Sequence, residues 1–181
     1  RGLGDVYKRQ QSKNKLLTTI GYKINGEITY ALEGSIFVAG SSIQFLRDKF
    51  KFFNSAEESE KLASSADIDS KVYLIPAFTG LGAPHWKPDA KGAIFGLTLN
   101  SGINEIALAT LEAIAFQTKE LLEAMEFDGA KISSIKIDGG MSNNSFFSQL
   151  LADTLKKEIY KPQDIETTAL GAAYLAAIGS G

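Results

Sequence analysis

Two adjacent glycines, Gly139 and Gly140, lie where an alternating apolar stretch runs into a segment with helical spacing. Residues 135–144 read Ile-Lys-Ile-Asp-Gly-Gly-Met-Ser-Asn-Asn, which predicts a strand, a tight turn and a helix. Glycines allow a sharp turn and the close approach of a ligand, and a following helix N-terminus offers free N–H groups and positive potential. The pattern therefore indicates a nucleotide or phosphate site, although strand–Gly-Gly–helix is also an ordinary structural connection.

His85 is the single histidine of the chain and lies beside Trp86 in a loop rich in glycine, proline and aromatic residues. A histidine that acts as a general base needs an oriented partner, and no such partner is evident near it in the sequence. We therefore interpret His85 as a structural residue. One histidine and no cysteine also exclude disulfides, thiolate chemistry and a metal site built from several histidines, so no metal ligands are predicted.

The composition is that of a globular protein: 44% of the 181 residues are hydrophobic, and 19 basic residues face 21 acidic ones. The net charge of -2 comes without a basic stripe, so we expect no nucleic-acid partner. No apolar run is long enough to span a bilayer, and no signal-peptide pattern is present. We expect a soluble chain without a membrane partner, and the lack of cysteine fits a reducing, cytoplasmic location.

The periodicity of the chain predicts the elements that must position these residues. Asn25-Gly26 between two β-prone runs predicts a hairpin, and Ser55 followed by Glu58 is typical of a capping box that opens a short helix ending near Ser64. Further strands are expected at 72–75, 92–99, 132–138 and 158–160, and further helices at 38–53, 103–125, 143–156 and 167–178. The alternation of strands and helices in the second half predicts an α/β protein with a sheet covered by helices.

Residues 1–11 have no clear periodicity and carry an excess of basic residues. We therefore expect this segment to be disordered or foreign, and the folded domain to comprise residues 12–181.

Several stretches together resemble the glycerol kinases of the FGGY carbohydrate-kinase family, in that family's order over about residues 12–179. They are YALEG (30–34), AGSSIQFLRD (39–48), PAFTGLGAPHW (76–86), GAIFGL (92–97), ATLEAIAFQT (109–118), DGGMSNN (138–144) and TALGAAYL (168–175). Lys87 departs from the commoner family text, which has an Asp after the Trp.

This resemblance implies a ribonuclease H-like domain of the actin and hexokinase type, with a mixed sheet flanked by helices. It further implies the C-terminal, ATP-binding half of a kinase that uses ATP and Mg²⁺ to convert glycerol to sn-glycerol 3-phosphate, and a homo-oligomer for the complete enzyme. The catalytic base and the glycerol site would lie in the N-terminal domain, so no catalytic residue is expected in this chain. Two alternatives stay open: another FGGY sugar kinase, for xylulose or gluconate, and a non-catalytic, nucleotide-responsive module of the actin-like superfamily.

By the same resemblance, four residues of this chain match the family's nucleotide contacts: Gly40, Gln44, Gly140 and Asn144. The glycines would let the backbone approach the nucleotide, and the two amides would hydrogen-bond to it. Without the resemblance, Gln44 would be interpreted as part of a solvated helix face and Asn144 as a helix N-cap.

Overall fold

The computed structural model describes residues 2–6 and 11–180, with side chains from residue 11 on. Its central element is α3 (Ile103–Phe127), which extends the expected helix by two residues. Glu105 accepts a hydrogen bond from the backbone N–H of Gly102 (2.7 Å), so a carboxylate closes the first turn of α3. Residues of α3 at helical spacing, among them Leu111, Ile114 and Met125, are buried. The helix therefore forms the base on which the other elements pack.

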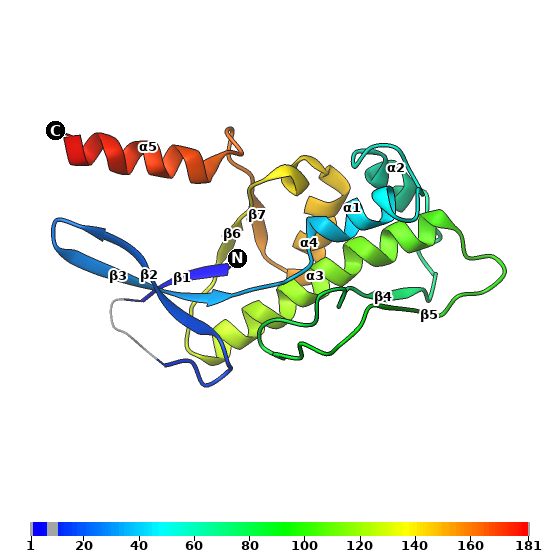
Figure 1. The fold of residues 1–181 in the computed structure, drawn as a ribbon, viewed down its shortest axis with the longest axis horizontal. Coiled ribbons are helices and arrows are strands. Elements are labelled where there is room, and N and C mark those ends of the chain that lie inside the picture. The colour runs from blue at the N-terminus through cyan, green and yellow to red at the C-terminus, as the bar shows by residue number, and fades with distance from the viewer. Residues whose placement is uncertain (1, 7–10, 181) are drawn as a thin grey trace.

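Shorter helices and two small sheets surround α3 (Figure 1). The helices α1 (Gly40–Asp48), α2 (Glu58–Ser64) and α4 (Ser145–Leu155) contact α3. Strand β4 (Tyr73–Ile75) also packs on α3 and pairs antiparallel with β5 (Ala93–Phe95). Strands β6 (Ser134–Lys136) and β7 (Glu158–Tyr160) pair in parallel, as expected when a helix, here α4, connects two strands.

The predicted hairpin is confirmed. Strands β2 (Leu17–Ile24) and β3 (Glu27–Gly34) are antiparallel, and the turn between them places Asn25 at φ 51° and Gly26 at φ 85°, both in the left-handed region. Among the described strands the sheet is divided into three parts, β1-β3-β2, β4-β5 and β6-β7. The α/β class is as predicted.

Part of the segment that the sequence predicts to be disordered or foreign pairs with the hairpin. Gly2–Val6 form a strand, β1, which pairs antiparallel with β3 in a register that places Gly2 opposite Gly34. Residues 7–10 lie outside the described part of the chain. That the domain itself begins at residue 12 stays a prediction, which limited proteolysis of the chain would test.

The first two predicted helices differ from the structure at their ends. The helix expected at 38–53 ends at Asp48, and Lys51 has a positive φ of 58°, which a helix cannot contain. Phe50 therefore does not continue the buried stripe; its side chain is exposed and its ring packs between those of Phe45 and Phe52. The second short helix ends at Ser64 as expected, but the Ser55–Glu58 capping box is not its start, since Glu57 is the N-cap residue.

The last helix, α5 (Thr167–Ser180), stands apart from the body of the molecule in Figure 1. Its small apolar side chains predict close approach to another helix or to a sheet, yet none of its residues is buried. Its start is held by hydrogen bonds from Thr167 Oγ1 to the Asp138 carboxylate and from Gly139 N to Ile165 O. No helix among the described residues is long and apolar enough to cross a membrane.

Candidate functional site

The first pair of predicted nucleotide residues lies on α1. Ile43 and Leu46 are buried against the core and set the orientation of the helix. Gly40 begins α1 and is half-buried, whereas Gln44 is exposed. Residues four apart share one face of a helix, so the Gln44 side chain extends from the same face as Gly40.

The second pair lies at the turn that follows β6. Gly139 has φ 76° and ψ 178°, a conformation that essentially only glycine adopts, and Gly140 then opens the short 3₁₀ helix η1 (Gly140–Asn143). Gly140 is exposed, and a Cβ built on it would have no other atom within 4 Å. The turn thus presents open backbone at Gly140, as an approaching ligand would require.

Asn144 is the N-cap residue of α4. Its Oδ1 accepts a hydrogen bond from Phe147 N at 2.7 Å, so the structural interpretation of this residue is correct. That bond uses only the oxygen of the amide. The Nδ2 group takes no part in the cap. The hydrogen bond from Phe147 N to Oδ1 fixes the orientation of the whole amide.

A close approach of Gly40 to Met141 joins the start of α1 to η1. A Cβ at Gly40 would lie 3.2 Å from both Cγ and Sδ of Met141, which is tighter than ordinary van der Waals contact. The first turn of α1 therefore lies directly against η1. We refer to the four predicted residues Gly40, Gln44, Gly140 and Asn144 together as the α1/η1 wall.

The N-terminus of α4 differs from the expectation that its N–H groups are free for a phosphate. Glu60 Oε1, from α2, accepts hydrogen bonds from Ser145 N (3.1 Å) and Phe146 N (3.2 Å). With Phe147 N bound to Asn144, three N–H groups of the first turn are already satisfied. A carboxylate of the protein itself thus occupies the place that the helix end offers to an anion.

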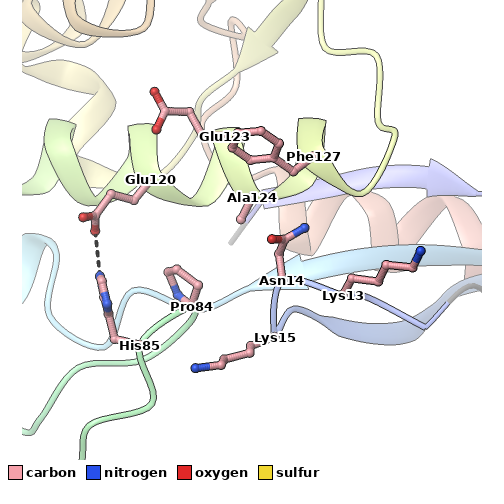
Figure 2. Close-up of a pocket in the computed structure, with 9 residues that line it drawn as sticks. All are labelled: Lys13, Asn14, Lys15, Pro84, His85, Glu120, Glu123, Ala124 and Phe127. Carbon is pink, nitrogen blue, oxygen red and sulfur yellow. Dashed lines mark hydrogen bonds and ion pairs between the residues drawn. The ribbon is translucent and has the colours of Figure 1, made fainter.

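His85 has an acidic partner that the sequence did not indicate. Its Nε2 lies 3.0 Å from Oε2 of Glu120 on α3, and both side chains are exposed. The pair lies at the edge of an open hollow of about 370 Å³, which Figure 2 shows between the loop that carries His85, the end of α3 and the segment before β2. None of the four residues of the α1/η1 wall lines this hollow.

A second hollow, of about 300 Å³, lies beside the turn itself. Its lining includes Ile137, Ser142, Ser145 and Lys161, and Lys161 Nζ donates a hydrogen bond to Asn143 Oδ1 at 2.8 Å. This hollow borders η1 and the first turn of α4, although the four predicted residues themselves do not line it.

Two acidic residues of α3 have shifted pKa values. Hydrogen bonds from the backbone N–H groups of Gly102, of Glu105 itself and of Asp67 lower the pKa of Glu105, whose carboxylate thereby ties residue 67 to α3. Burial raises the pKa of Glu112, and the charge of Lys71 partly opposes that rise. Within the described residues, no group of three or more His, Asp or Glu side chains could hold a metal ion.

Sequence reasoning missed two residues that shape the α1/η1 wall. Met141 fills the space between Gly40 and the core, and Glu60 holds the first turn of α4. Met141 lies inside the DGGMSNN stretch and could have been singled out as its one large apolar side chain. Glu60 offered no local signal, because its partners lie in a distant part of the chain.

Comparison with known sequences places this arrangement in a family. The profile of the C-terminal domain of the FGGY family of carbohydrate kinases matches residues 8–180. This chain belongs to the FGGY family. Glycerol kinase from Alteromonas mediterranea is 56% identical to it over 171 residues, which are 94% of this chain and 35% of that protein. The FGGY domain described here thus spans about a third of the length of the curated relatives that it matches.

Solved structures of FGGY kinases have the same fold. The crystal structure of Plasmodium falciparum glycerol kinase with ADP matches 90% of this chain and 33% of its own, with a TM-score of 0.81 and 38% identity. The ligand-bound xylulose kinase from Lactobacillus acidophilus matches 98% of this chain and 36% of its own, with a TM-score of 0.82 at 22% identity. The expected ribonuclease H-like fold of the actin and hexokinase type is confirmed for this FGGY domain.

Proposed function

We propose that this FGGY domain is the ATP-binding part of a glycerol kinase, which transfers the γ-phosphoryl group of ATP to glycerol and yields sn-glycerol 3-phosphate. The observation that carries this proposal is the 56% identity to a glycerol kinase over 94% of the chain. The likeness to a xylulose kinase, at 22% identity, extends to the fold alone and does not favour that substrate.

The α1/η1 wall supports a nucleotide as its ligand. The open backbone at Gly140 allows a flat group to approach closely, the Gln44 amide can donate to or accept from its edge, and the Nδ2 group of Asn144 can donate to it. Because Glu60 already occupies the N-terminus of α4, we propose that this wall binds an uncharged part of the nucleotide and not its phosphates.

The remaining groups of the reaction are assigned by the resemblance. We propose that the base that accepts the glycerol proton, and the glycerol site, belong to the N-terminal domain of the complete enzyme. Since the described residues offer no cluster of metal ligands, we propose that Mg²⁺ enters on the phosphates of ATP, where it neutralises charge during phosphoryl transfer. We also propose that the complete enzyme works in the cytoplasm as a homo-oligomer; the lack of cysteine is consistent with a reducing compartment.

The substitution Asn144→Ala in the full-length protein tests the nucleotide assignment. Loss of a polar contact worth about 1 kcal/mol or somewhat more should raise the Michaelis constant for ATP about five-fold or more. The constant for glycerol should change little, because the glycerol site is proposed to lie in the other domain. The control is Asn54→Ala, which removes an exposed amide outside the wall.

Three outcomes would contradict the proposal. If Asn144→Ala raises the Michaelis constant for glycerol and leaves that for ATP unchanged, Asn144 does not belong to the nucleotide site. A full-length protein that binds ATP but forms no sn-glycerol 3-phosphate from glycerol would favour the non-catalytic, actin-like module, and turnover of xylulose or gluconate in preference to glycerol would favour another sugar kinase.

A further inference from the structure

Glu60 joins α2 to the turn that carries Asn144. Its Oε1 accepts two backbone hydrogen bonds, from Ser145 N at 3.1 Å and Phe146 N at 3.2 Å, and its side chain is half-buried between the helices. A single carboxylate oxygen thus satisfies the two N–H groups that immediately follow Asn144. Hydrogen bonds to a charged acceptor are stronger than those between neutral groups, and these two join segments that lie 85 and 86 residues apart in the chain.

The helix that carries Glu60 is itself well anchored. In α2, Ser59 and Ala63 are buried, and Ser59 Oγ donates a hydrogen bond to Ala56 O at 2.6 Å. The helix contacts both α3 and α4. Glu60 therefore extends from a fixed support, and its carboxylate can determine where the first turn of α4 lies.

The link bears directly on the Asn144 amide. With Ser145 N and Phe146 N satisfied by Glu60, the Asn144 Oδ1 accepts only from Phe147 N, which fixes one orientation of the amide. Without Glu60, the N–H groups of Ser145 and Phe146 would lose their partner, and the Asn144 oxygen could turn toward Phe146 N, since N-cap side chains accept from either the second or the third N–H of a helix. The Nδ2 group would then point in more than one direction.

We propose that Glu60 is a positioning residue for nucleotide binding: it holds the first turn of α4 so that the Asn144 amide keeps one orientation in the α1/η1 wall. This inference rests on the proposed function, since it takes Asn144 as a nucleotide contact. Glu60 itself touches no ligand in this scheme. Its contribution reaches the nucleotide only through Asn144.

The test uses the full-length protein that contains this chain. It measures kcat, the Michaelis constants for ATP and for glycerol, and the shift in Tm that ADP produces. E60A removes both hydrogen bonds and should raise the ATP constant about three- to ten-fold and reduce the ADP-induced shift in Tm, while kcat and the glycerol constant change less than two-fold. E60Q keeps an acceptor oxygen at the same reach and should stay within about two-fold of the parent protein. The matched control is E58A, which removes an exposed carboxylate of the same helix.

A double-mutant cycle with N144A separates positioning from a general loss of structure. If Glu60 acts through Asn144, E60A/N144A should bind ATP within about two-fold of N144A alone, because the second change has nothing left to position. Should E60A fail to fold, E60D replaces it; its carboxylate keeps the charge but is withdrawn by one methylene, and a rise in the ATP constant is expected again.

The outcomes divide as follows. If N144A raises the ATP constant and E60A does not, or if their effects multiply in the double mutant, the positioning role is wrong while the proposed function stands. If N144A leaves the Michaelis constant for ATP unchanged, the nucleotide assignment fails. A raised Michaelis constant for ATP in E60A would then show that Glu60 acts by another route. If E60A lowers kcat and raises the Michaelis constants for ATP and glycerol by similar factors, Glu60 has a purely structural role and the inference is overturned.

Discussion

Replacing each glycine of the Gly139–Gly140 turn by alanine should separate a residue needed for the fold from one needed for the ligand. Gly139 has φ 76° and ψ 178°, which an alanine adopts only at a cost of about 1–3 kcal/mol. Gly140 is not among the glycines with positive φ, and a Cβ on it meets no atom within 4 Å. Gly140→Ala should therefore leave the free energy of unfolding unchanged or raise it by up to about 1 kcal/mol, through a lower entropy of the unfolded chain.

Among variants that fold, the Michaelis constant for ATP should rise more in Gly140→Ala than in Gly139→Ala. In Gly140→Ala the new methyl group enters the open space of the α1/η1 wall, where we propose that the nucleotide approaches. A forced overlap of this size costs about 1 kcal/mol or more, which corresponds to a Michaelis constant for ATP raised about five-fold or more. The glycerol constant should remain unchanged.

The difference in the free energy of unfolding is measured by urea unfolding of the 181-residue chain, followed by far-UV circular dichroism and by the fluorescence of its single tryptophan, Trp86. The difference in the Michaelis constant for ATP is measured by steady-state kinetics of the full-length protein. Equal destabilisation by the two substitutions would refute the backbone argument. An unchanged ATP constant in Gly140→Ala would show that no ligand comes close to this glycine.

Two further predictions concern stability. Gly96→Ala should destabilise the chain by about 3–5 kcal/mol in the same urea experiment, because its Cβ would lie 1.8 Å from the Lys71 carbonyl oxygen. Gly129→Ala, also at positive φ but with no atom within 4 Å of the added Cβ, should cost only about 1–2 kcal/mol. Similar losses of stability in both variants would contradict the steric argument. Burial alone would raise the pKa of Asp128, but hydrogen bonds from Ser12 and from residues 13 and 14 outweigh burial and lower that pKa. The carboxylate therefore contributes stability above its unfolded pKa of about 4, and this contribution is lost as the pH falls further. Asp128→Asn should show a shallower loss of Tm between pH 5 and pH 3, and a loss as steep as that of the parent chain would refute this role.

Local patterns in the sequence were enough to predict most elements of the fold. The Asn25-Gly26 turn, the buried stripe of α3 and the N-cap role of Asn144 each depend on residues within a few positions of one another, and the structure bears them out. The helix that ends at Asp48 shows where such reasoning fails. Its apolar spacing continues to Phe50, but aromatic packing among Phe45, Phe50 and Phe52 replaces the last turn.

Only the tertiary structure decided how the candidate site is assembled. The contact of Gly40 with Met141 and the hydrogen bonds of Glu60 to the first turn of α4 join segments that lie far apart in the chain, and no local periodicity records such pairs. The same holds for the N–H groups of α4, which the sequence suggested were free for a phosphate. Whether a helix end is open depends on which side chain the fold brings to it, and here the packing of α2 against α4 brings a carboxylate.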